Sequence, residues 1–342
     1  MPSSLQHPPS SFTLVTGGAG FIGSHLVERL LKDGNNVVIV DDFSTGSREN
    51  LRSFAGNPRL KVIAAKMSRC RQLPELAARA DFIFHLAATV GVDLVVKSAL
   101  HVLETSFNET QVLLRAAAKL GTPLLLTSTS EVYGKSAKPE FSEEDDLLIG
   151  PPGHSRWSYA CSKLTDEFLA LAYAREQNLP VIIARLFNTV GPRQTGRYGM
   201  VLPRFIAAAR RNQPLRVFGD GAQSRCFCLV HDVVEALVRL QHCQAARGEI
   251  FNIGGTEEVS ILELAKLVIN TLGSKSKIEQ IPYDQAYAPG FDDMRRRKPR
   301  VKKLHQFAGF KPQTPLREII RLTAACDGGH LCRPQPRERQ KV

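Results

Sequence analysis

One stretch near the start of the chain constrains the fold more than any other. Residues 13–46 read TLVTGGAGFIGSHLVERLLKDGNNVVIVDDFSTG. A short β-branched run leads into a glycine-rich turn, a helical pattern follows over 21–33, and a second apolar run ends at Asp41. Two such strands joined by a crossover helix form a parallel pair with the helix on one face. This stretch therefore predicts an α/β fold.

The glycine spacing within this stretch predicts a dinucleotide site. Gly17 allows a tight turn, Gly20 lets the backbone approach a pyrophosphate, and Gly23 permits close packing of the helix. The following helix directs its free N–H groups and positive dipole end at the phosphates. Asp41 is placed to accept hydrogen bonds from ribose hydroxyls, and its charge would repel a 2′-phosphate. The pattern favours NAD over NADP.

The first half of the chain repeats the alternation of strand and helix. Further helices are predicted within 93–119 and over 156–177. Strands are predicted near 12–16, 36–41, 60–65, 81–86, 122–127 and 180–186. We expect a Rossmann-type, doubly wound parallel sheet, with a smaller C-terminal substrate-binding lobe over the carboxyl edge of the sheet.

The same alternation divides the chain into a main domain and a lobe. We expect a disordered leader over 1–11 and a basic tail over 329–342. An NAD-binding domain is predicted over 12–187, to which 229–258 return, and the substrate-binding lobe over 188–228 and 259–328.

Composition narrows the range of partners. The net charge is +12, much of it in 291–342, but that stretch lacks the interleaved aromatic residues of a nucleic-acid arm. No apolar run reaches the ~18 residues that span a bilayer. The seven cysteines form no CxxC pair, and Cys226 and Cys228, which alternate along an expected strand, do not alone make a metal site. We expect a reduced, cytoplasmic protein that binds no metal, nucleic acid or membrane.

Two further stretches carry residue types suited to acid–base chemistry. In YACSK, Tyr159 and Lys163 lie four residues apart on a predicted helix and therefore on one face. An ammonium beside a phenol lowers the phenol's pKa, so the tyrosine can act as a base. Upstream, LLLTSTSEVYG brings Thr129, Ser130 and Glu131 to the carboxyl end of a strand. Hydroxyl groups at that edge can orient a sugar hydroxyl towards the tyrosine.

Together with the glycine turn, these stretches resemble the extended short-chain dehydrogenase/reductase family, in its nucleotide-sugar epimerase/dehydratase branch. The resemblance extends from about residue 12 to about residue 325. It also rests on HLAA (85–88), ARLFNTVGPR (184–193), FGDGAQSRCF (218–227), VHDVVEAL (230–237) and FNIGG (251–255). It implies a UDP-sugar substrate, and a homodimer formed through the helices near 100–119 and 156–177.

The resemblance also assigns roles to matching positions. Tyr159 would remove the C4 hydroxyl proton as hydride moves from C4 to NAD, with Thr129 at the C4 oxygen and Lys163 at the nicotinamide ribose. The implied cofactor contacts are Gly17, Gly20, Phe21, Ile22, Gly23, Asp41, Asp42, Ser44, Thr45, Gly46, Leu86, Ala87, Ala88, Tyr159 and Lys163. The implied substrate contacts are Asn188, Val201, Leu202, Arg225 and Arg297. One departure is Ser106, which replaces a structural asparagine of the family.

The residues around the 4-keto sugar favour one reaction of this branch. Ser130 stands where a 4,6-dehydratase carries an aspartic acid, which counts against dehydration. Glu131 and Arg297 match the UDP-glucuronate decarboxylases, in which the arginine lies near the substrate carboxylate. Glu131 as a structural acid and Arg297 in a solvated basic loop are the plainer interpretations. A UDP-sugar 4-epimerase is the alternative function, and a non-catalytic NAD-binding protein is disfavoured because Tyr159 and Lys163 are both present.

Overall fold

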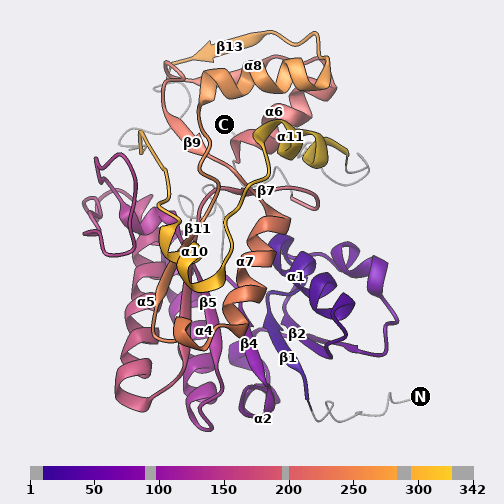
Figure 1. Cartoon of the computed structure of the whole chain (residues 1–342), viewed down its shortest axis with the longest axis vertical. Coiled ribbons are helices and arrows are strands. Elements are labelled where there is room, and N and C mark those ends of the chain that lie inside the picture. The colour runs from indigo at the N-terminus through magenta and orange to yellow at the C-terminus, as the bar shows by residue number, and fades with distance from the viewer. Residues whose placement is uncertain (1–10, 89–97, 195–199, 283–293, 326–342) are drawn as a thin grey trace, which may run out of the picture.

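A seven-stranded parallel sheet forms the centre of the computed structural model (Figure 1). The structure describes residues 11–88, 98–194, 200–282 and 294–325. The strand order is β11-β6-β5-β4-β1-β2-β3, and each neighbouring pair is parallel. The strands are β1 (Thr13–Thr16), β2 (Val37–Asp41), β3 (Leu60–Ala64), β4 (Phe82–His85), β5 (Leu124–Thr129), β6 (Val181–Leu186) and β11 (Ile250–Ile253).

Helices cover both faces of this sheet because its strands are apolar on both sides. Leu14 of β1 packs in one core and its neighbour Val15 packs in the other, as alternate strand residues must. One face carries α1 (Phe21–Lys32), α7 (Val230–His242) and α10 (Lys302–Ala308). The other face carries α2 (Leu73–Arg79), α4 (Ala99–Ala118) and α5 (Trp157–Gln177). The order of the strands reverses between β1 and β4, which is where open α/β sheets bind their ligands.

A second, smaller core lies beyond the carboxyl edge of the sheet, at the upper end of Figure 1. Its helices are α6 (Val201–Arg210), α8 (Ile261–Leu272) and α11 (Leu316–Ala325). Three two-stranded pieces accompany them, formed by β7 (Thr189–Val190) with β10 (Cys228–Leu229), β9 (Ser224–Cys226) with β12 (Glu258–Ser260), and β8 (Leu215–Phe218) with β13 (Ile278–Ile281). This lobe lies over the edge at which the site is predicted.

A buried ion pair fixes α5 against the sheet. Glu167 of α5 accepts hydrogen bonds from the Arg185 guanidinium of β6, with N–O distances of 2.7 to 3.2 Å, and from the Ser128 hydroxyl of β5 at 2.5 Å. Both charged side chains are 3% exposed. Removal of one partner would leave an uncompensated buried charge, which costs about 3–5 kcal/mol. The pair therefore holds α5 in register with the ends of β5 and β6.

The structure confirms the predicted fold class, and the predicted strands and helices agree with it to within about two residues at most ends. One expectation is wrong. Cys226 and Cys228 do not alternate along one strand, because Cys226 ends β9, which pairs with β12, whereas Cys228 begins β10, which pairs with β7. The predicted basic tail and nearly all of the predicted leader lie outside the described residues.

Candidate active site

The glycine turn has the close contacts that its sequence predicts. Gly17 has a φ of +70°, and a Cβ there would lie 2.7 Å from the Ala87 backbone nitrogen. A Cβ on Gly23 would lie 2.1 Å from the Gly17 carbonyl oxygen, so α1 packs directly on the turn. No side chain among the described residues caps the N-terminus of α1. Its first N–H groups are thus available to a ligand, and the half-buried Phe21 and Ile22 form its first turn.

Asp41 lies at the end of β2 beside this turn. Its carboxylate accepts hydrogen bonds from the Ala19 and Phe43 backbone N–H groups, both at 2.8 Å. Burial raises the pKa of this carboxyl group. Each oxygen still has a lone pair for a ribose hydroxyl, so the hydrogen bonds that hold Asp41 also orient it. Asp41 is therefore placed for the role that the sequence predicts.

The remaining predicted cofactor residues surround the same turn. Asp42 accepts hydrogen bonds from both the backbone N–H and the hydroxyl of Ser44, which shapes the loop after β2. Gly46 approaches Ala19 so closely that a Cβ would lie 2.9 Å from its carbonyl carbon. Leu86, Ala87 and Ala88 follow β4 and are half-buried. The Leu86 N–H donates to the Thr16 carbonyl. Thr45, Leu86, Ala87 and Ala88 thus belong to the two loops that flank the glycine turn.

Tyr159 and Lys163 occupy one face of α5, opposite the end of β5. The side chains of Thr129 and Tyr159 share a hydrogen bond. The Thr129 hydroxyl also accepts the Glu131 N–H at 3.3 Å, which shapes the short 3₁₀ turn Ser130–Tyr133, in which Ser130 is buried. The Lys163 ammonium is 3% exposed and donates to the Asp166 carboxylate at 3.0 Å.

The pKa of Tyr159 departs from the sequence expectation. It lies above its ordinary value, chiefly because of burial and then because of the negative charges of Glu131 and Asp166, whereas the hydrogen bond with Thr129 acts in the opposite direction. Lys163 was expected to lower it, but its ammonium is paired with Asp166. The physical reason is that the negative charge of Asp166 offsets the positive charge of Lys163 at the neighbouring phenol.

Glu131 lies at the centre of a cluster of arginines. Its carboxylate is bound by the Arg297 guanidinium at 2.5 Å and by that of Arg156 at 3.1 Å, and Arg225 is near enough to act on its charge. These cations outweigh the effect of burial and hold the pKa of Glu131 below its ordinary value. Glu131 is thus a carboxylate at neutral pH, held by the guanidinium groups of Arg156 and Arg297. Arg297 does not lie in a solvated loop, because its side chain is only 11% exposed.

The other predicted substrate residues lie along the second lobe. Arg225 on β9 is buried, and its guanidinium donates to the Ser224 carbonyl at 2.8 Å. The Asn188 side chain, between β6 and β7, donates to the Cys226 carbonyl at 2.9 Å and so links this segment to β9. Val201 begins α6 and is half-buried, but the Leu202 side chain is fully buried in the core of the lobe. Leu202 as a whole residue is inaccessible in this structure, so the structure does not support the predicted contact between Leu202 and substrate.

Sequence reasoning missed two residues of this site, Arg156 and Asp166. Arg156, Tyr159, Lys163 and Asp166 are spaced by three, four and three residues, which places all four on one face of a helix. That spacing was visible in the sequence once Tyr159 and Lys163 had been chosen. It did not show that Arg156 would bind Glu131, or that Asp166 would bind Lys163.

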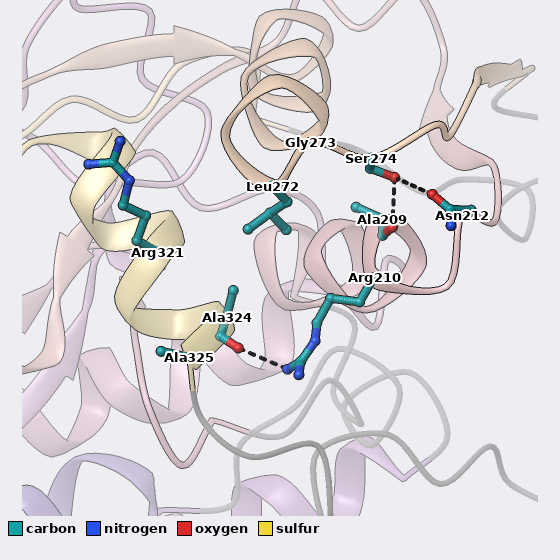
Figure 2. A pocket seen from close by; sticks show the side chains of 9 residues that line it. All are labelled: Ala209, Arg210, Asn212, Leu272, Gly273, Ser274, Arg321, Ala324 and Ala325. Atoms are coloured by element: carbon teal, nitrogen blue, oxygen red, sulfur yellow. Dashed lines mark hydrogen bonds between the residues drawn. The ribbon is translucent and has the colours of Figure 1, made fainter.

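A second concave region lies in the smaller lobe, away from these residues. Figure 2 shows it between the carboxyl ends of α6, α8 and α11, where Arg210 donates to the Ala324 carbonyl at 2.8 Å. It has a volume of about 500 Å³ and is lined by Ala209, Arg210, Asn212, Leu272, Gly273, Ser274, Arg321, Ala324 and Ala325. These lining residues include no carboxylate, histidine or cysteine, and the Ser274 hydroxyl donates to the Ala209 carbonyl, so we do not assign the active site to this cavity.

Comparison with known proteins agrees with this arrangement. Residues 13–254 match the NAD dependent epimerase/dehydratase family. This chain belongs to that family. One relative is a UDP-N-acetyl-alpha-D-glucosaminuronate decarboxylase of Bacillus cytotoxicus, 42% identical over 91% of this chain and 95% of the relative. Another is UDP-glucuronic acid decarboxylase 4 of Arabidopsis thaliana, 38% identical over 90% of this chain and 67% of the relative.

A solved structure adds the cofactor. It is a UDP-glucuronic acid 4-epimerase from Bacillus cereus in complex with NAD, with 29% identity, a TM-score of 0.81, and coverage of 91% of this chain and 97% of that one. The present chain, as a member of the family, is an NAD-dependent enzyme. Its glycine turn, the uncapped N-terminus of α1 and the Asp41 carboxylate fit that cofactor. Within the described ranges no helix is both long enough and apolar enough to cross a membrane, and no three metal-binding side chains gather.

The contact between Gly23 and Gly17 gives the first prediction. We expect Gly23→Ala to weaken NAD binding at least about tenfold and to destabilise the fold by about 1–3 kcal/mol, because a Cβ would overlap the turn. Calorimetric titration with NAD and thermal denaturation would measure both effects. Gly153→Ala is the control, since a Cβ there has no neighbour within 4 Å. Equal NAD affinity in the two variants would contradict this account of the turn.

Proposed function

We propose that this enzyme is a UDP-glucuronate decarboxylase that forms UDP-xylose and CO₂ through a 4-keto sugar. The observation that carries the proposal is the cluster that Glu131 forms with Arg156 and Arg297. The charge of Arg225 also acts on the Glu131 carboxylate. Three arginines act on the charge of this one carboxylate, and the Glu131 charge in turn raises the pKa of Tyr159, so the cluster lies near the proposed base.

The guanidinium groups of this cluster suit a uronate better than a neutral sugar. Arg297 and Arg156 both bind Glu131 in largely buried surroundings. A guanidinium donates through a planar fork that matches the geometry of a carboxylate. The C6 carboxylate of a UDP-uronate is the substrate group that such donors would recognise, and a neutral hexose has no anion at C6.

The chemistry follows from the position of Tyr159. Its phenolate takes the proton of the C4 hydroxyl, and Thr129 lies beside it to hold the same oxygen. NAD, when bound, accepts the C4 hydride and later returns it. With a ketone at C4, the C5–C6 bond breaks, CO₂ leaves, and its electron pair forms an enolate across C5, C4 and the C4 oxygen. C5 then takes up a proton from solvent, and Tyr159 returns its proton to the C4 oxygen as the alcohol re-forms.

UDP-N-acetylglucosaminuronate is a second candidate substrate. The relative from Bacillus cytotoxicus is named for a decarboxylase of that sugar and is 42% identical, compared with 38% for the relative named for glucuronic acid. The two sugars differ only at C2, so they share the carboxylate and the C4 hydroxyl on which the proposed chemistry depends. The arginine cluster suits both.

Product analysis tests the proposal and separates it from the 4-epimerase alternative. The enzyme would be incubated with NAD and each UDP-uronate, and the products examined by mass spectrometry and NMR. We expect loss of CO₂ and a UDP-pentose, or its 2-acetamido form. An unchanged mass with an inverted C4 signal would overturn decarboxylation in favour of epimerisation. The substrate with the larger kcat/KM would identify the C2 substituent.

We also propose a homodimer formed through α4 and α5, which pack against each other. Leu100, Leu103 and Phe107 follow a helical spacing on α4 and are 68%, 39% and 37% exposed, and Phe168 on α5 is 63% exposed. Large apolar side chains gathered on a surface mark interfaces. Light scattering should give the dimer mass, and Leu100→Glu with Phe168→Glu should give the monomer. Val62→Glu on the edge strand β3, 37% exposed, is the control.

A further inference from the structure

Asp166 is a charged residue of the site to which the proposed mechanism gives no role. Its side chain is completely buried on α5, one helical turn after Lys163. One carboxylate oxygen, Oδ2, accepts both the Lys163 ammonium at 3.0 Å and the Ser106 hydroxyl at 2.9 Å. Ser106 lies on α4, so this oxygen links the two helices at the level of Lys163.

The second oxygen of Asp166 is not satisfied. Within the part of the chain that the structure describes, Oδ1 has no hydrogen-bond partner. An ionised carboxylate that is fully buried with one oxygen unsatisfied costs free energy, and its presence needs a reason. A structural link alone does not supply one, because Glu167, the next residue, already fixes α5 to the sheet through Arg185 and Ser128.

Asp166 instead acts on the two residues that the chemistry needs. It binds the ammonium of Lys163, and its negative charge is one of those that raise the pKa of Tyr159. Lys163 and Tyr159 are flexible side chains on the same helix face, and a fixed anion one turn away limits where the ammonium can lie. Ser106 on α4 donates its hydroxyl to the same carboxylate oxygen and so helps to fix the position of Asp166.

We propose that Asp166 is a positioning residue, which holds the Lys163 ammonium in place and sets the net charge that Tyr159 experiences. This inference rests on the proposed role of Tyr159 as base. Asp166 keeps the tyrosine protonated until a further positive charge arrives, and the nicotinamide ring of NAD supplies that charge. Proton removal from the sugar is thereby linked to the presence of the oxidised cofactor.

Other charged groups also face Tyr159 and Lys163 and could affect the pKa of Tyr159. Glu131, from the 3₁₀ turn after β5, raises the pKa of Tyr159, and its own charge is balanced by Arg156, Arg297 and Arg225. His85 at the end of β4 faces Lys163, and burial together with that ammonium lowers its pKa to about 3, so it is neutral. Asp166 is therefore the anion whose removal changes the field at Tyr159 without disturbing the arginine cluster.

The test measures the dissociation constant of NAD by calorimetry from about pH 6 to about pH 10, which requires no sugar turnover. A cationic nicotinamide ring favours the phenolate, so NAD affinity should rise with pH until Tyr159 is deprotonated. Tyr159→Phe should remove this rise of NAD affinity with pH, which would show that Tyr159 is the group that titrates. In Asp166→Asn we expect the rise to move about one pH unit lower, the size of effect that one nearby buried charge produces.

Ser106→Ala is the matched variant, because it removes a hydrogen bond from the same oxygen and leaves the charge. We expect its pH dependence to coincide with that of the wild type. If Asp166→Asn does not fold, the double variant Lys163→Met/Asp166→Asn removes both charges of the pair and leaves none unpaired. Compared with Lys163→Met alone, it should show the same downward shift of about one unit.

Two outcomes would overturn the proposal. One is a pH dependence in Asp166→Asn that coincides with the wild type, which would make Asp166 purely structural. The other is an equal shift in Ser106→Ala, which would assign the effect to the hydrogen bonds and not to the charge. Failure of every UDP-uronate as a substrate would disprove the proposed function and would leave these NAD titrations interpretable.

Discussion

Tyr159→Phe should abolish decarboxylation, with a fall in kcat of about 10²–10⁴-fold, because the variant has no group to take the C4 hydroxyl proton. In wild type, the pKa of Tyr159 is raised, so the reactive phenolate is lost as the pH falls and the rate should rise with pH. The measurement is the rate of CO₂ loss from UDP-glucuronate as a function of pH, followed by mass spectrometry.

Thr129→Val is the companion variant, since it removes the hydrogen bond to Tyr159 and keeps the shape of the side chain. That hydrogen bond acts to lower the pKa of Tyr159, so its loss should move the pH dependence of the rate towards higher pH. A Tyr159→Phe enzyme that retains wild-type kcat would show that another group is the base.

Arg297→Ala should lower kcat/KM for a UDP-uronate by about 30- to 5,000-fold, the range expected when one partner of a buried charge pair is removed, about 2–5 kcal/mol. The variant loses a cation from the substrate carboxylate and leaves Glu131 with one direct arginine partner, Arg156. Steady-state kinetics with UDP-glucuronate would measure the loss. NAD affinity should be little changed, because the residue that Arg297 pairs with, Glu131, is not among the predicted cofactor contacts.

The neighbouring Arg296 provides the control for this variant. Its guanidinium pairs with Glu258 at 2.5 Å and is 48% exposed, so Arg296→Ala removes the same charge from the same segment without touching the cluster. Surface pairs of this kind contribute about 0–1 kcal/mol. Equal losses in the two variants would indicate a general electrostatic attraction of the substrate, and would contradict a specific contact with Arg297.

Local patterns in the sequence predicted most of the fold and part of the site. The glycine turn, Asp41 and the apolar strands are each recognised within a few dozen residues, because the hydrophobic period and the turn chemistry are local properties. Tyr159 and Lys163 were proposed in the same way, by their spacing on one helix, and the structure places both on one face of α5. These predictions needed no knowledge of how distant segments pack.

The features that the sequence did not predict are contacts between distant segments. The pairing of Glu131 with Arg297 joins residues that are far apart in the chain, and three adjacent arginines gave no sign of which one turns inward. The raised pKa of Tyr159 depends on Asp166 and Glu131 at once. Charges from several elements act together on Tyr159 and Glu131, so no local sequence motif predicts these pairings or the direction of the pKa shift.

The segment that carries Arg297 is hydrogen-bonded on both sides of that residue. The Arg295 carbonyl accepts the Ser224 N–H of the second lobe at 2.9 Å, while Lys298 and Arg300 pair with the Phe141 backbone at 2.8 and 2.9 Å. In such an extended segment, a shift of one residue turns each side chain to the opposite face. Evolution can therefore exchange side chains here and so alter sugar preference, but an insertion or deletion between 295 and 300 would remove the arginine from the site altogether.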